Sequence, residues 1–301
     1  MKKDITFEII KDIESAQKVF LEFSPKETLY DTWEFRHCFY KYFNFELRFY
    51  VGSVDGERIG VLPLQYNSEL QHLEFFGTYF METNQVFIKP GFESYIPDFY
   101  AAIDEPCNLE YINNQGNFFD EVPPQDYKFT LPLNKYKNFE DYFNTEFTSK
   151  SRANIKKKLK EIEDQNTITI KKGIREDMET LFVFSIKTFR AKDDQSSFEF
   201  PFRKEIYRDF LDLPFEYDIL VFFINGKKQA VSFSFFYKDH YIFLNTGANI
   251  PDIPNLGTYT YLKNIENAFK SGKNIFDAGV GPYSWKERFH LTKTPQYQIK
   301  K

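Results

Sequence analysis

The hydrophobic and polar positions of this chain change their period repeatedly, and the changes mark alternating strands and helices. Ile5–Ile10 favours a strand, and Ile13–Phe23 predicts a helix because its apolar residues fall on one face. A second, aromatic helix is expected over about Leu29–Tyr42. Two β-prone runs then flank Asp55 and Gly56, a dipeptide typical of hairpin turns. The first half therefore opens as strand, helices and hairpin.

The second half repeats this order. Asn225 and Gly226 separate two further β-prone runs, and Gly226 follows Gly56 by 170 residues. The same interval of 170 residues separates Gly77 from Gly247, and each of these glycines ends a third β-prone run. A loop that contains proline, a helix and a short strand follow in both halves. We interpret the chain as a tandem duplication with divergence.

The expected boundary between the copies lies within Glu121–Asn134, where three prolines interrupt regular structure. We therefore expect one domain over residues 1–133 and a second over residues 134–301.

Composition and charge narrow the class of protein. A chain of 301 residues with 42% hydrophobic and 28% charged residues is typical of folded domains. The 2 cysteines and 4 histidines show no metal-ligand spacing, so we expect no metal and a reducing, cytoplasmic location. We read neither a signal peptide nor a membrane-spanning segment. The formal net charge of −5 gives no overall attraction to DNA.

The helix predicted over Thr258–Lys270 offers a candidate anion site. Pro251, Pro254 and Gly257 precede it and prevent an earlier helix start. Its first free backbone N–H groups should then fall at about Gly257 to Tyr259, where a phosphate could bind. An ordinary helix start fits the pattern equally well.

A strongly basic helix lies between the two halves. It has a capping start at Ser149, and its apolar residues are spaced for one face. The other face is either a solvated surface or an anion-binding wall. Its basic residues are Lys150, Arg152, Lys156, Lys157, Lys158 and Lys160.

Three segments carry a resemblance to a known family. Ser149–Lys158 looks like the basic helix that opens the second domain of that family, and Leu244–Leu262 looks like its acyl-donor loop. Phe276–Phe289 looks like its Asp-x-Gly-Gly segment with a following Lys-x-x-Phe element. With the repeated element order, the sequence resembles tandem-GNAT acyltransferases of the BioF2-like or CelD-type, which are related to the FemABX peptidyltransferases. The resemblance implies a mixed α/β fold of two tandem GNAT-like (acyl-CoA N-acyltransferase) domains.

The resemblance also implies that the two domains have different roles. The first domain would be scaffold and acceptor wall, and the second would bind acetyl-CoA or another acyl-CoA. The acceptor would be the amine of a small molecule or of a cell-wall or polysaccharide precursor. The usual GNAT phosphate loop is absent, since Gly257 supplies only one of its glycines. An aminoacyl-tRNA donor and a non-catalytic binding module therefore remain alternatives.

The implied site residues fall into three groups. Asp277 could act as a base or orient the acceptor amine, and an ordinary turn residue is the alternative. By resemblance, Tyr283 would protonate the leaving group and Lys286 would neutralise developing negative charge; a packing tyrosine and a surface lysine are the alternatives. His290 could act as a base, but a structural role fits better. The donor-binding residues implied are Asn245, Gly247, Leu256, Gly257, Thr258 and Tyr259, and those for an anionic substrate are Lys150, Arg152, Lys156 and Lys157.

Overall fold

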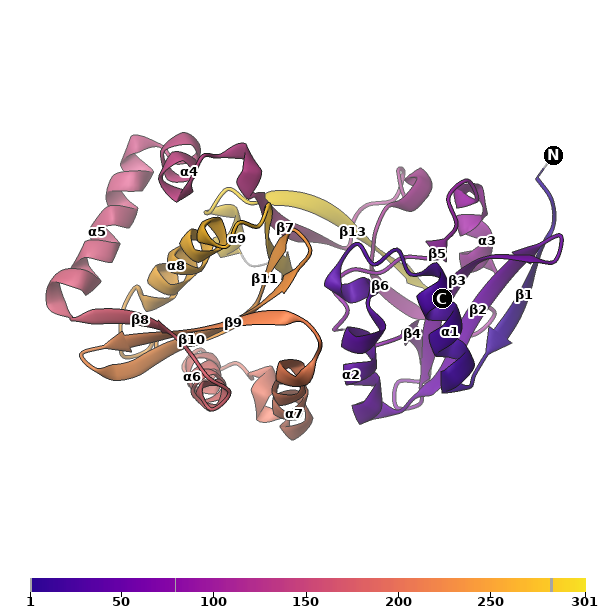
Figure 1. Cartoon of the computed structure of the whole chain (residues 1–301), viewed down its shortest axis with the longest axis horizontal. Coiled ribbons are helices and arrows are strands. Elements are labelled where there is room, and N and C mark those ends of the chain that lie inside the picture. The colour runs from indigo at the N-terminus through magenta and orange to yellow at the C-terminus, as the bar shows by residue number, and fades with distance from the viewer. Residues whose placement is uncertain (1, 79, 282–283) are drawn as a thin grey trace. The chain divides into compact units, whose positions relative to one another are not determined.

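The computed structural model describes residues 2–78, 80–281 and 284–301, with the side chains of residues 284 and 285 left out. The chain forms two compact units (Figure 1). Unit 1 comprises Met1–Lys128, Val280–Pro282 and Lys293–Lys301, and unit 2 comprises Phe129–Gly279 and Tyr283–Thr292.

Unit 1 is built on an antiparallel sheet with the strand order β1-β2-β3-β4, and β5 pairs with β3. Its strands are β1 (Ile5–Ile10), β2 (Glu46–Val54), β3 (Glu57–Asn67), β4 (His72–Phe75), β5 (Phe87–Ile88) and β6 (Asn108–Ile112). Its helices are α1 (Ile13–Phe23), α2 (Trp33–Phe43) and α3 (Ile96–Ala101), with 3₁₀ turns at Leu29–Asp31, Glu93–Tyr95 and Gln115–Asn117.

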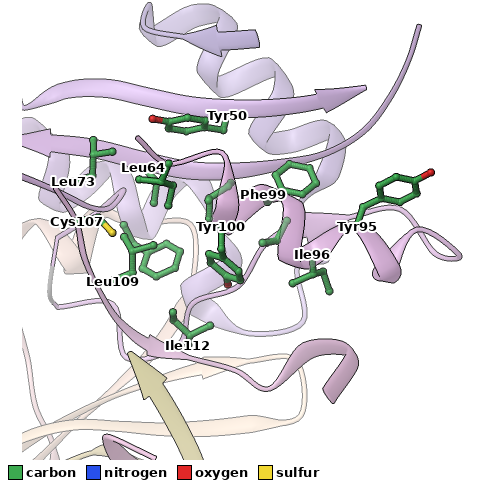
Figure 2. Close-up of a cluster of buried hydrophobic side chains, with 14 of the residues drawn as sticks. Tyr50, Leu64, Leu73, Tyr95, Ile96, Phe99, Tyr100, Cys107, Leu109 and Ile112 are labelled. Carbon is green, nitrogen blue, oxygen red and sulfur yellow. The ribbon is translucent and has the colours of Figure 1, made fainter. Parts of the chain in front are cut away.

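Apolar side chains from the strands and from α3 form one core of unit 1 (Figure 2). Leu64 on β3 and Phe99 on α3 are fully buried, and Leu109 contributes from β6. Side chains of α3, β4 and β6 therefore share one buried core.

Unit 2 repeats the plan with the strand order β12-β11-β10-β9-β8. Its strands are β8 (Ile168–Lys172), β9 (Glu216–Ile224), β10 (Lys227–Tyr237), β11 (His240–Ala248) and β12 (Ile275–Val280). Its helices are α4 (Phe139–Glu146), α5 (Ser149–Gln165), α6 (Asp177–Arg190), α7 (Pro201–Asp209), α8 (Leu256–Lys270) and α9 (Ser284–Glu287), with 3₁₀ turns at Leu133–Lys135, Ser197–Glu199 and Phe210–Asp212. Strands β7 (Asp126–Pro132) and β13 (Thr292–Lys300) contain residues of both units.

The internal repeat predicted from the sequence is present. In both hairpins the turn dipeptide has positive φ, 51° and 80° at Asp55 and Gly56, and 51° and 75° at Asn225 and Gly226. Strand β8 pairs with β9 as β1 pairs with β2, and β11 pairs with β10 as β4 pairs with β3. The helix that follows differs, since α3 has 6 residues and α8 has 15.

Two local expectations need correction. The helix expected over Leu29–Tyr42 is a 3₁₀ turn followed by α2, because Thr32 has extended backbone with φ −94° and ψ 141°. The N-cap of α5 is Thr148, whose side chain accepts a hydrogen bond from the Ser151 amide, so Ser149 is the first helical residue.

Candidate functional site

Strands β11 and β12 run parallel, but they pair only over their first residues. The last pair is Ile242 with Asp277, whereas β11 continues to Ala248. Against β10 the register skips Leu244, which marks a bulge in β11. A bulge bends a strand and ends regular pairing. Among the described strands, none lies beside the far end of β11 on its β12 side, so that edge is open.

Helix α8 begins next in the chain and leaves two backbone donors free. Asn255 precedes it with a left-handed φ of 67° and makes no side-chain cap. Within the described residues, the amides of Gly257 and Thr258 have no acceptor, and both residues are partly exposed. The Tyr259 amide, which the sequence placed with them, instead donates to the Asn255 carbonyl at 3.0 Å. Two adjacent donors at the positive end of a helix of 15 residues suit an anion.

The side chains of Leu256 and Tyr259 belong to the core rather than to an open site. They are 0% and 4% exposed and pack in a cluster that includes Ile162 of α5. Burial, together with Glu163, raises the pKa of Tyr259 to about 12. These two residues anchor the start of α8, and the donors that face solvent are backbone groups.

Gly247 is needed for helix packing. A Cβ at this position would lie 2.0 Å from the carbonyl oxygen of Leu181, so the backbone of α6 already occupies the space. Asn245, two residues earlier, is partly exposed, and its Nδ2 lies 3.4 Å from the Tyr207 hydroxyl. A role of either residue toward a donor stays a prediction.

Asp277 and Lys286 converge on one residue at the end of β12. Asp277 is 2% exposed, and its Oδ1 accepts a hydrogen bond from the Gly279 amide at 2.9 Å. Lys286 is also 2% exposed, and its Nζ donates to the Gly279 carbonyl at 3.2 Å. The same Nζ lies 5.2 Å from the centre of the Phe129 ring. Lys286 is therefore not a surface lysine; Tyr283 lies outside the described residues.

Gly279 makes this convergence possible. Its φ of 69° is in the left-handed region, which glycine adopts without strain. The Asp-x-Gly order in the sequence is the signal that could have revealed this turn. The bulge at Leu244 had no such signal, because it lies inside a uniform apolar run.

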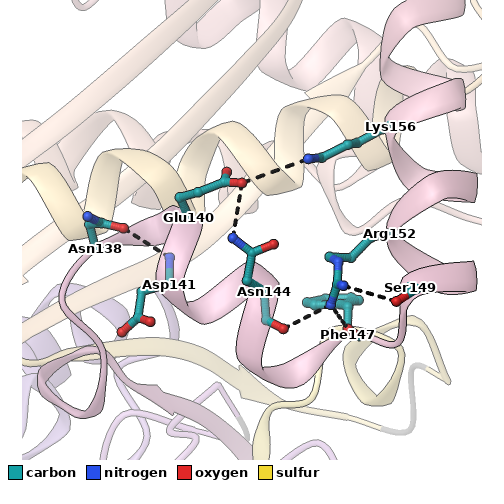
Figure 3. Close-up of polar contacts among 8 residues, drawn as sticks. All are labelled: Asn138, Glu140, Asp141, Asn144, Phe147, Ser149, Arg152 and Lys156. Carbon is teal, nitrogen blue, oxygen red and sulfur yellow. Dashed lines mark hydrogen bonds and ion pairs between the residues drawn. The ribbon is translucent and has the colours of Figure 1, made fainter.

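Some basic side chains of helix α5 bind other parts of unit 2, and others are exposed to solvent (Figure 3). The guanidinium of Arg152 donates to the Asn144 carbonyl at 2.9 Å and also to the Phe147 carbonyl, so it caps the end of α4. Lys156 lies 3.8 Å from Glu140. Lys150 is exposed and has no ion-pair or hydrogen-bond partner within the described part of the chain.

Within the described residues, the one ion-pair partner of Lys157 is Glu161, at 4.0 Å. Exposed pairs of this kind contribute little energy and exchange readily. Of the cations proposed for an anionic substrate, Lys150 and Lys157 are thus the most available.

Among the described residues, neither His290 nor a metal centre adds a candidate to the site. His290 is exposed, and its ring stacks edge-on against Phe147 with 4.7 Å between centroids. No cluster of metal ligands occurs in the residues that the structure covers. None of the described helices is long and apolar enough to span a bilayer.

Sequence comparison finds a family match in the second half of the chain. Residues 149–287 match the model of a family described as acetyltransferase (GNAT) domain. The match includes the open edge of β11, the start of α8, Asp277 and Lys286. No match was found among curated proteins.

Solved structures share the fold over nearly the whole chain. FemX is 11% identical, with a TM-score of 0.58 over 97% of this chain and 96% of its own. L-PGS from Bacillus licheniformis is 14% identical, with a TM-score of 0.57 over 97% and 92%. A tandem GNAT protein from the clavulanic acid biosynthesis pathway is 10% identical, with a TM-score of 0.54 over 98% and 96%. The predicted tandem GNAT fold is confirmed, while the narrower resemblance to BioF2-like or CelD-type proteins rests on the sequence alone.

Proposed function

We propose that the protein is an N-acyltransferase that moves an acyl group, acetyl in the simplest case, from an acyl-CoA to an amine. The observation that carries this proposal is the pair of free amides at Gly257 and Thr258. They start a helix directly after the open edge of β11, inside the region that matches the GNAT acetyltransferase domain.

The donor site would use backbone groups. The amides of Gly257 and Thr258 would hold donor phosphate, and the open edge of β11 would take an extended chain. Asp252 lies in the loop before α8, but Lys187 at 2.5 Å and Asn249 at 3.1 Å bind its carboxylate. These contacts lower the pKa of Asp252 and offset the repulsion that its charge would exert on an anion.

The transfer itself needs few side chains. The amine nitrogen forms a bond to the acyl carbon and loses one proton, the bond from that carbon to sulfur breaks, and the sulfur takes up one proton. Holding both reactants together supplies much of the rate enhancement. We propose that Lys286 stabilises negative charge that develops near the end of β12 and that Tyr283 provides the proton. Asp277 would act mainly by fixing the Gly279 turn, because its Oδ1 already accepts that amide.

The acceptor and the location follow from the same proposal. The acceptor would be the amine of a small molecule or of a cell-wall or polysaccharide precursor, with unit 1 as scaffold and acceptor wall. We propose a cytoplasmic location, supported by two buried cysteines, Cys38 and Cys107, that do not form a disulfide with each other.

Substitution of Thr258 tests the donor site. Thr258→Glu places a negative charge in the first turn of α8, which should raise stability by about 0.3–1 kcal/mol through the helix dipole. The same charge should repel donor phosphate, so we expect acetyl-CoA to bind at least tenfold more weakly by isothermal titration. Thr258→Gln, of similar size but neutral, should bind within threefold of the parent. Equal affinity of the two variants would contradict the donor site.

A second candidate is aminoacyl transfer from a charged tRNA. It is favoured by the exposed Lys150 and Lys157 on α5 and by the presence of a single glycine, Gly257, at the start of α8. The fold likeness to FemX and L-PGS is compatible with it. Transfer from an aminoacyl-tRNA without binding of acyl-CoA would select this candidate. Ligand binding without transfer from either donor would indicate a non-catalytic module.

A further inference from the structure

Unit 1 contains a pocket at the place where β4 and the neighbouring parallel segment that leads into β6 separate. Leu73 on β4 bridges to Cys107, just before β6, and its amide donates to the Pro106 carbonyl at 2.8 Å. Further along, β6 pairs instead with Asn84, through a bridge to Ile112. A pocket of about 150 Å³ is lined by residues of β4, of β6 and of the loop after β4.

The pocket is acidic: its described lining contains no lysine or arginine, and His72 is the one basic residue in it. Glu74 and Glu110 both line it, and Glu74 is only 4% exposed. The Glu74 carboxylate accepts from Gln65 Nε2 at 2.8 Å and, at 3.4 Å, from Asn67 Nδ2, both neutral amides. No ion pair involves Glu74 among the described residues. Burial raises the pKa of Glu74, and the nearby charge of Glu110 raises it further.

A second, independent feature is an unsatisfied hydroxyl in the same pocket. Thr78 lines the pocket and is 3% exposed, and its Oγ1 has no hydrogen-bond partner within the described part of the chain. Leaving such a group unpaired costs free energy. Together with Glu74, it gives the pocket buried hydrogen-bond acceptors that form no ion pair with a cation of the described residues.

Hydrogen bonds from residues outside the lining fix the loop that carries Thr78, so the pocket is preformed. The buried guanidinium of Arg36 donates to the Phe76 carbonyl at 2.8 Å and to Asn84 Oδ1 at 2.9 Å. Gln65 Oε1 accepts from the Gly77 amide at 3.2 Å. Arg36 itself does not line the pocket, and its guanidinium is used in hydrogen bonds that hold the loop after β4.

We propose that this pocket binds the ammonium group of a small primary amine. A primary ammonium has three N–H donors, and the pocket offers two carboxylates and one hydroxyl as acceptors. Leu70, Phe75 and Met81 give the lining an apolar part that suits a short carbon chain, and the remaining lining residues are His72, Asn84, Asn108 and Tyr111. The site lies wholly in unit 1, so the proposal stands independently of the acyl transfer proposed for unit 2.

Titration of the full chain with n-propylammonium chloride tests the site. We expect saturable binding of one equivalent by calorimetry, and no binding of n-propanol, which lacks the charge. Glu74→Gln should weaken the binding at least tenfold while retaining the acceptor for Gln65. Glu69→Gln removes the same charge from an exposed position before β4 and should leave affinity within twofold.

Thr78→Val, which keeps the side-chain shape but removes the hydroxyl, provides a second variant. We expect it to weaken binding several-fold, and circular dichroism verifies that each variant is folded. Absence of binding to the parent, or equal binding to the parent and a folded Glu74→Gln variant, would overturn the proposal. Displacement of n-propylammonium by potassium chloride at equal concentration would also overturn it in favour of an inorganic cation site.

Discussion

At the scale of single residues, glycines decide the close approaches in unit 2. Gly247 allows the α6 backbone to reach β11, since a Cβ there would meet the Leu181 carbonyl oxygen at 2.0 Å. Gly279 serves a different need, because its φ of 69° lets its amide and carbonyl engage Asp277 and Lys286 in turn. One glycine is required for space and the other for backbone conformation.

The two requirements can be separated by substitution to alanine. Gly247→Ala forces backbone atoms apart, and we expect it to lower the free energy of unfolding by about 3 kcal/mol, near the upper end for overpacking. Gly226→Ala meets open space at φ 75° and should cost only the strain of that conformation, about 1–2 kcal/mol. Urea denaturation measures both. Equal losses in the two variants would show that contact with α6 does not determine the need for glycine at position 247.

The sequence predicted the free amides of the candidate site because the signal for a helix start is local. The prolines before α8 limited its start, and this placed free amides at Gly257 and Thr258. Tyr259 was included wrongly because the carbonyl of Asn255 is positioned by a left-handed φ, which no periodicity reveals. The burial of Lys286 was also missed, since it depends on contact with Phe129, far away in the chain.

At the scale of elements, α5 combines a structural cation with free ones. Arg152 caps the end of α4 and is committed to that contact (Figure 3). Lys150 and Lys157 lie on the same helix and are exposed. The sequence presented all of these residues as one basic face, and only the position of α4 distinguishes them.

Charge reversal on α5 tests its role as an anion-binding wall. If charged tRNA is a donor, Lys150→Glu combined with Lys157→Glu should weaken tRNA binding at least tenfold at moderate salt, because two phosphate contacts become repulsive. Lys192→Glu combined with Lys227→Glu makes the same charge change at exposed sites elsewhere in unit 2 and serves as control. Filter binding measures both, and the same loss in the control would show only a general charge effect.

Elements were predicted where periodicity was strong. The bounds of α1 and β1 agree with the sequence because each has a clear pattern and a defined boundary. Helices α4 and α7, with 8 and 9 residues, were not predicted. Strand β13 contains Pro295 and mostly polar residues, which argued against a strand.

At the scale of the whole molecule, the duplication explains why one copy would bind the donor. Of the two copies, the second has the long helix, α8, after the strand β11 that separates from β12. The free amides lie at the start of that helix. In the first copy, α3 is short, and the separating segments enclose the acidic pocket with Glu74. We infer that the two copies diverged toward different ligands, an anion in unit 2 and a cation in unit 1.

The internal repeat could be predicted from the sequence. The assignment of the last residues of the chain to unit 1 could not. Lys293–Lys301 groups with unit 1, where Lys300 pairs with Asn108 and the Lys301 amide donates to the Cys107 carbonyl at 3.0 Å. This pairing joins segments that are far apart in the sequence, and a strand gives no local sign of its partner. Turn spacing revealed the duplication because each turn is encoded within a few residues.

The central claim is that the first turn of α8 binds the donor through the amides of Gly257 and Thr258. Nuclear magnetic resonance of the ¹⁵N-labelled chain during titration with acetyl-CoA tests it directly. We predict that these two amides show the largest shifts and become protected from solvent exchange. Saturable binding that leaves both amides unchanged, or that perturbs only unit 1, would contradict the account.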